Sequence, residues 1–181
     1  MLDLADLPSC TKCALSEHRQ RVVIGSGPER SSLMVLGEAP GRSEDEGGAP
    51  FIGRSGRLLF ELIGDELGRR RDECFVTNVV KCRPPANRTP RPREIAMCRP
   101  WLDEQLRRCE PAVVLALGNT AAKSLFGFDE GISVTHGRVV QLGGAKGVAT
   151  YHPAAALRGG PSVVEVMRGD LRIVRELLGA R

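Results

Sequence analysis

Strand and helix patterns alternate along this chain, so the sequence predicts an α/β protein with a central, mainly parallel four-stranded sheet covered by helices on both faces. Short apolar runs of the kind that form buried strands recur four times, and stretches with helical apolar spacing follow them. The 181 residues suffice for one substantial core but hardly for two. We therefore expect a single domain over residues 1–181.

Each element is predicted from its own stretch of sequence. The predicted strands are 32–37, 74–80, 112–118 and 147–152, and residues 136–142 are a candidate for a further short strand. Apolar residues at helical spacing predict helices around 58–67, around 102–106 and over 162–178. In parallel sheets ligands bind at the carboxyl ends of the strands. The segments that follow the four strands, which we expect to be loops, are therefore the candidate functional segments.

Composition narrows the functional classes. Hydrophobic residues make up 41% and charged residues 27%, a globular balance that argues against disorder. No apolar run is long enough to span a bilayer, and the N-terminus lacks a signal-type apolar core, so we expect a cytoplasmic protein with no membrane contact. The net charge of +4 fits binding to a polyanion without requiring it.

Four of the six cysteines are candidate metal ligands. Cys10 and Cys13 form a C-x2-C pair, and Cys82 and Cys98 flank a segment rich in Pro and Arg. Because the cytosol keeps thiols reduced, we do not expect a disulfide framework. Four thiolates brought together suit tetrahedral zinc or an iron-sulfur cluster, and spacing alone does not choose between them. The other two cysteines are expected to be ordinary buried residues.

Five motifs in order along the chain resemble those of a known family. They are CTKC, GEAPGRSEDEGGAPFIGRSGRLL, TNVVKCRPPANRTP, CRPWL and YHPAAALR. In order and spacing they are similar to family 4 uracil-DNA glycosylases, the iron-sulfur branch of the uracil-DNA glycosylase superfamily. The resemblance implies a three-layer α/β/α sandwich and hydrolysis of the N-glycosidic bond of a uracil flipped out of DNA, which leaves an abasic site. It also implies a [4Fe-4S] cluster on Cys10, Cys13, Cys82 and Cys98.

Polar and aromatic residues near the predicted strand ends would supply this chemistry. Asn78 can accept from uracil N3-H and donate to O4 with one amide, a pattern that cytosine does not match. The resemblance implies that His152 donates to uracil O2 as charge develops on the departing base. Glu38 and Asn87 are candidates for positioning the attacking water. Phe51 would stack on the flipped base.

Other residues are expected to shape the pocket or to contact DNA. Glu44 is expected near uracil C5, where its bulk would oppose the methyl group of thymine. Glycines let backbone amides approach a base or a phosphate, and GRSG opens a helix whose N-terminus suits an anion. The further uracil-binding candidates are Gly37 and Ala39. The DNA-binding candidates are Arg54, Ser55, Arg88, Leu157 as the wedge that fills the vacated space, and Arg158 on the backbone.

One departure and two alternatives accompany this interpretation. His136 stands in SVTHGR where the family commonly has arginine, so the DNA contact there is open. The alternative function is a DNA-binding or damage-sensing module that is held together by a metal or cluster and does not cleave. Glu38, Asn87 and His152 together argue against it. The cysteines are too widely spread for a ferredoxin-like electron carrier. We expect a monomer that acts on uracil-containing DNA, single- or double-stranded.

Overall fold

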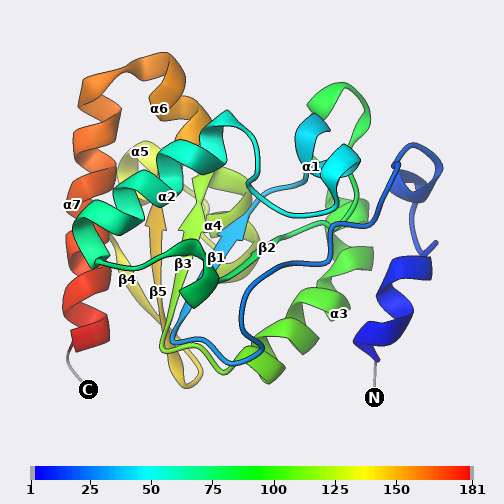
Figure 1. Ribbon diagram of the computed structural model, residues 1–181, viewed down its shortest axis with the longest axis horizontal. Coiled ribbons are helices and arrows are strands. Elements are labelled where there is room, and N and C mark those ends of the chain that lie inside the picture. The colour runs from blue at the N-terminus through cyan, green and yellow to red at the C-terminus, as the bar shows by residue number, and fades with distance from the viewer. Residues whose placement is uncertain (1–2, 180–181) are drawn as a thin grey trace.

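The computed structural model describes residues 3–179 and shows helices on both sides of a central sheet (Figure 1). The sheet has the strand order β2-β1-β3-β5-β4. Its strands are β1 (Leu33–Gly37), β2 (Phe75–Asn78), β3 (Val113–Leu117), β4 (Val139–Leu142) and β5 (Ala145–Thr150). Four strands are parallel, as predicted, and β4 pairs antiparallel with β5 at one edge. The fold class is confirmed, and the predicted count of four strands is one too low.

Helices cover the sheet in two layers that the sheet separates. One layer contains α2 (Arg54–Leu67), α6 (Pro153–Gly159) and α7 (Pro161–Gly179), and the other contains α3 (Pro92–Cys109) and α4 (Gly118–Phe126). The shorter helices are α1 (Arg42–Gly47), α5 (Ile132–Thr135) and the 3-10 helices η1 (Leu4–Ser9), η2 (Ala14–Glu17), η3 (Arg71–Glu73) and η4 (Pro85–Asn87). No helix of residues 3–179 is both long and apolar enough to cross a membrane.

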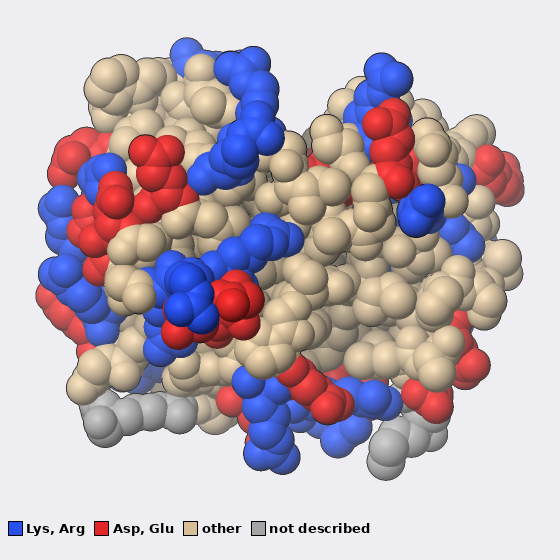
Figure 2. Space-filling view, in the orientation of Figure 1, with Lys and Arg blue, Asp and Glu red and all other residues tan. Residues whose placement is uncertain are grey.

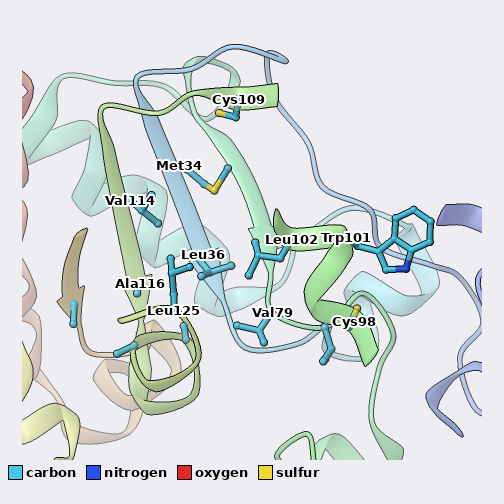
Figure 3. Packing of buried hydrophobic residues seen from close by; sticks show 14 of the residues in the cluster. Met34, Leu36, Val79, Cys98, Trp101, Leu102, Cys109, Val114, Ala116 and Leu125 are labelled. Atoms are coloured by element: carbon cyan, nitrogen blue, oxygen red, sulfur yellow. The ribbon is translucent and has the colours of Figure 1, made fainter. Parts of the chain in front are cut away.

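Alternate residues of the strands build two hydrophobic cores. Met34 and Leu36 of β1 face α3 and α4, whereas Leu33 and Val35 face α2 and α7. Figure 3 shows the α3 side, where Met34, Leu36 and Val114 pack with Leu102. Because both faces are covered, each strand reads as a continuous apolar run, which explains why the parallel strands were predictable.

Segments predicted as loops contain helices, and residues 42–47 after β1 form α1. Residues 118–126 form α4 and residues 153–159 form α6. Helix α6 begins with Pro153, a favoured first position because proline has no N-H to satisfy, and the His152 side chain caps it. Alanine-rich sequence then continues the helix. The candidate residue His152 is therefore held at the N-cap of α6, and Leu157 and Arg158 lie within the helix.

Candidate active site

The carboxyl ends of the four parallel strands open into one cavity of about 840 Å³. Figure 2 shows this end of the molecule hollowed between the region of α6 and the region of α1, with Lys and Arg side chains on both sides. The predicted residues that line the cavity are Glu38, Ala39, Glu44, Phe51, Ser55, Asn78, Asn87, Arg88, His152 and Arg158. Three further candidates, Gly37, Arg54 and Leu157, do not line it.

The floor of the cavity is built by the paired ends of β1 and β2. Gly37 lies opposite Asn78 in the parallel register. A Cβ on Gly37 would approach Asn78 Oδ1 to 2.4 Å and Phe51 Cζ to 2.5 Å, closer than real Cβ contacts. Gly37 therefore has a packing role: its missing side chain lets an amide and an aromatic ring meet at the cavity floor.

Asn78 presents an unsatisfied polar atom in this floor. The residue is 1% exposed, and its Oδ1 is buried with no hydrogen-bond partner in the structure. A buried acceptor left without a donor costs about 1 to 3 kcal/mol. Such an atom beside a cavity is a binding feature, because a ligand N-H would satisfy it.

His152 lines the cavity beside Phe51 as a neutral imidazole. Its ring centroid is 5.8 Å from that of Phe51. Burial, with a smaller contribution from the charge of Arg158, lowers the His152 pKa to about 4. Its Nδ1 accepts from the Ala154 backbone N-H at 3.2 Å, so the ring proton resides on Nε2. The residue is thus a preformed N-H donor of one fixed tautomer.

Glu38 and Asn87, the two candidates for positioning a water molecule, both line the cavity. Thr120, in the first turn of α4, donates its hydroxyl to Oε2 of Glu38. This contact orients the carboxylate and leaves Oε1 available to accept from water. The Oδ1 of Asn87 already accepts from Arg83 Nε at 2.7 Å, so its amide NH2 is the group left to interact. The two candidates thus offer different groups to a ligand.

Glu44 holds the glycine-rich segment together. One carboxylate oxygen accepts from the Gly53 N-H at 2.9 Å and the other from the Gly41 N-H at 3.1 Å. It lines the cavity with both oxygens already engaged. The next residue, Asp45, accepts from the backbone N-H groups of Gln20 and Arg21. The carboxylates of Glu44 and Asp45 therefore accept hydrogen bonds from backbone N-H groups.

Three of the five predicted DNA-binding residues, Ser55, Arg88 and Arg158, line the cavity, and the other two are their neighbours in the chain. Arg54 and Ser55 begin α2, and Ser55 also lines the cavity. Leu157 is on α6, and its side chain is 44% exposed. Arg158 follows it at the cavity wall. Arg88 forms a two-pronged ion pair with Glu94 at 2.8 and 2.6 Å, so its charge is already balanced.

The His136 side chain contacts other residues of the protein. Its Nδ1 lies 3.1 Å from Asp170 Oδ1, and the other carboxylate oxygen accepts from Thr150 at 2.7 Å. Burial raises the Asp170 pKa, while Thr150 and His136 oppose that shift. The ring also packs on Tyr151, with centroids 5.6 Å apart. The histidine therefore braces the segment that carries His152.

A second, small cavity lies beside the N-terminal segment. Its lining includes all four candidate thiols, Cys10, Cys13, Cys82 and Cys98, so the structure brings together the predicted set. Of the other two cysteines, Cys74 precedes β2 and Cys109 ends α3, and both are buried. Figure 3 shows Cys98 beside Trp101, with Cys109 at the other end of the helix.

Two side chains donate hydrogen bonds to these thiols, and the buried Lys81, whose Nζ donates to Thr77 and Asn78, lies near them. Trp101 Nε1 donates to Cys10 Sγ at 3.3 Å, and Arg19 donates to Cys82 Sγ at 3.4 Å. Lys81 also lines the cavity and is fully buried, and burial lowers its pKa to about 8 while Cys98 and Cys82 oppose that shift. This environment suits an anionic sulfur-ligated group. Within residues 3–179, no three His, Cys, Asp or Glu side chains are arranged to hold a single metal ion.

Several residues at the site were not predicted, and two of them hold predicted residues in place. Thr120 belongs to GNTAAKS, a segment that the sequence marks as functional without singling out the threonine. Arg71 contacts the backbone of Phe51 from 20 residues away in the chain. It lies in GRRRDEC, where nothing distinguishes it from its neighbouring arginines.

Comparisons with known proteins agree with the motifs. The family model of the Uracil DNA glycosylase superfamily matches residues 24–170 of this chain. The chain is 45% identical to a type-4 uracil-DNA glycosylase of Thermotoga maritima, over 82% of this chain and 78% of the relative. It is 40% identical to that of Sulfurisphaera tokodaii (93% and 80%) and 39% identical to that of Archaeoglobus fulgidus (97% and 92%). The chain therefore belongs to the uracil-DNA glycosylase superfamily, in the type-4 group that the sequence predicts.

Proposed function

We propose that the cavity receives one uracil flipped out of DNA and that the surrounding residues hydrolyse its N-glycosidic bond. The prediction of a uracil-DNA glycosylase is confirmed by the family comparisons, which favour it over a non-cleaving DNA-binding module. The residue roles are our proposal. The observation that carries them is the orphaned Oδ1 of Asn78, buried beside Phe51 in the cavity floor.

Asn78 and Phe51 would bind the base. The Asn78 Oδ1 accepts from uracil N3-H, and its NH2 donates to O4, which satisfies the buried amide. Cytosine carries an acceptor at N3 and a donor at C4, so it would leave both groups unpaired. The Phe51 ring, beside His152, offers a stacking face. Ala39 and Glu44 line the same cavity, and Glu44 fixes its shape near C5.

His152 and Glu38 would carry the bond cleavage. Negative charge develops on uracil as the glycosidic bond breaks, and the Nε2-H of neutral His152 donates to O2 where that charge collects. Because the imidazole is neutral beforehand, it stabilises the leaving anion without giving up its proton. Glu38, oriented by Thr120, accepts a hydrogen bond from the water that attacks the sugar carbon. Asn87 would donate from its NH2 and hold that water or the sugar in place.

The predicted DNA-binding residues would hold the DNA around the flipped nucleotide. Leu157 is an exposed apolar side chain that can enter the stack left by the flipped base. Arg158 lies beside it, and the first turn of α2 with Arg54 and Ser55 offers backbone N-H groups to a phosphate. Arg88 would contact phosphate while remaining paired with Glu94. Because these contacts are to phosphates, DNA binding should weaken as the salt concentration rises.

The four thiols would hold a [4Fe-4S] cluster. Their convergence on one cavity, the Trp101 and Arg19 donors on sulfur and the buried Lys81 support an anionic cluster there. In the described part of the chain no three side chains are arranged to hold one metal ion, so the four thiols fit a cluster, whose irons each take one thiolate, better than they fit one zinc ion. When bound, the cluster supplies a cross-link between the N-terminal segment, the segment after β2 and α3. Catalysis itself uses the residues of the larger cavity.

Loss of a ligand should empty the cluster site. In Cys98→Ala we expect iron content to fall to background and the yield of folded protein to drop, because one corner of the cluster has no thiolate. Cys109→Ala, on the same helix but at its other end, should keep its iron. The measurement is iron per chain by metal analysis together with visible absorption. Full iron content in Cys98→Ala would contradict the assignment.

The activity itself is tested by release of free uracil. We expect a single strand containing one uracil to lose the base and to break at that position after alkali, whereas the matched thymine strand stays intact. The measurement is a single-turnover time course. Binding of the uracil strand without base release would instead support a non-cleaving module.

A further inference from the structure

Phe51 has an unfavourable backbone conformation. Its φ is 54°, in the left-handed region that residues with a Cβ rarely occupy. Such conformations persist only when surrounding contacts hold them, and they collect at functional sites. The nearby first turn of α2 is packed so closely that a Cβ on Gly56 would lie 1.8 Å from the Phe51 carbonyl oxygen. The ring thus depends on a backbone that something must hold.

Arg71 fixes this backbone through hydrogen bonds. From η3, its Nη1 donates to the Phe51 carbonyl oxygen at 3.1 Å, and its Nη2 donates to the carbonyl oxygen of Pro50. The same Nη2 donates to Ser26 Oγ at 3.2 Å. Its guanidinium lies 4.8 Å from the ring centre of Phe60 in α2, a cation-π arrangement. One planar fork therefore ties the turn before Phe51 to three separate segments.

The charged guanidinium of Arg71 donates to neutral acceptors. In the described part of the chain no carboxylate forms an ion pair with it, and burial lowers its pKa while the charge of Glu44 opposes that shift. Neighbouring Arg70 is different, because it is exposed and pairs with Asp72 at 3.0 Å. A partly buried guanidinium aimed at two successive carbonyls is a device for fixing backbone geometry.

We propose that Arg71 is a positioning residue for uracil recognition, which holds the left-handed Phe51 backbone so that the ring forms one wall of the base pocket. This inference rests on the proposed role of Phe51 and adds a residue that need not touch the base. Together with Glu44, which holds Gly53 on the other side of Phe51, Arg71 fixes the turn from both ends. Without the fork, Phe51 can relax toward an ordinary conformation and carry its ring out of the pocket.

Arg71→Lys tests the fork while it keeps the charge. A lysine has one donor group on a flexible stem and does not bind two carbonyls and a hydroxyl in one plane. We expect the inhibition constant of free uracil to rise about tenfold and KM to rise with it, with kcat less affected. Arg70→Lys, the matched control, should behave as wild type. Ser26→Ala removes one acceptor only and should give a two- to threefold rise, which keeps the test informative if Arg71→Lys folds poorly.

A double-mutant cycle separates this inference from the role of Phe51. If Arg71 acts through Phe51, Arg71→Lys should cause no further loss in the Phe51→Ala background. An equal loss in both backgrounds, or wild-type uracil inhibition in both Arg71→Lys and Ser26→Ala, would overturn the inference. Unchanged uracil inhibition in Phe51→Ala alone would instead remove the stacking role on which it rests.

Discussion

His152→Ala should lower the single-turnover rate of uracil release by about 10²- to 10³-fold, the loss expected for one donor aimed at developing negative charge. DNA affinity should change little, because the imidazole acts on the departing base and not on the phosphates. The matched control is His18→Ala, which removes an exposed histidine next to η2. Near wild-type excision in His152→Ala would reduce His152 to the helix cap that it also forms.

The pH dependence gives a second measurement on the same residue. Since the His152 pKa is lowered to about 4, the neutral donor form persists through the range where a free histidine, with a pKa near 6.5, would protonate. We therefore expect no loss of excision attributable to His152 between pH 8 and about pH 5. Below about 6.5 the unfolded chain takes up a proton that the folded chain excludes, so the free energy of unfolding should fall as pH drops toward 4. In His152→Ala this part of the pH dependence should vanish.

Asn78→Asp should reverse the hydrogen-bond pattern at the cavity floor. The introduced carboxylate still accepts but no longer donates to uracil O4, so two acceptors face each other in a buried site. We expect uracil excision to fall by at least about 10²-fold. Cytosine N4-H2 can donate to the new carboxylate, and a protonated acid can also donate to cytosine N3. The variant should therefore gain weak excision of cytosine from single strands or mismatches.

The measurement for Asn78→Asp is release of free base from two oligonucleotides that differ only at the target, one with uracil and one with cytosine. Single-turnover conditions isolate base release from product dissociation. Uracil excision at the wild-type rate would show that Asn78 does not read the base. Loss of uracil excision without a gain on cytosine would support the donor role and contradict the exchange of specificity.

The parts of the structure that were predictable depend on local sequence. Leu33 to Leu36 form an uninterrupted apolar run because both faces of the sheet are covered, and Leu59, Leu62 and Ile63 repeat at helical spacing because one face of α2 is buried. Asn78 and His152 could be placed in one site because the carboxyl ends of parallel strands share an edge. Strand β4 is half-exposed at the edge of the sheet, so its signal is weak.

The contacts that escaped prediction are set by tertiary packing. Arg71 contacts the backbone of Pro50 and Phe51 only because η3 folds against this turn, and no local pattern encodes that proximity. The hydroxyl of Thr120 meets Glu38 across 82 residues of chain. The helices α4 and α6 were missed for another reason, because Gly118 and Pro153 suggest loops when they in fact begin helices. The motifs therefore contain most residues that line the cavity but not Arg71 and Thr120, which hold two of the predicted residues in place.

The pairing of Gly37 with Asn78 across β1 and β2 limits how the enzyme can change through single mutations. Any side chain at position 37 would occupy the space between the amide and the Phe51 ring, so alanine, the smallest step, already blocks the floor. A shift of one residue in β2 would turn Asn78 to the opposite face of the sheet. Each change would displace one or both of the two residues that we propose bind the base. New base preferences are thus more accessible through exchange of the functional group at position 78 than through gradual reshaping of the pocket.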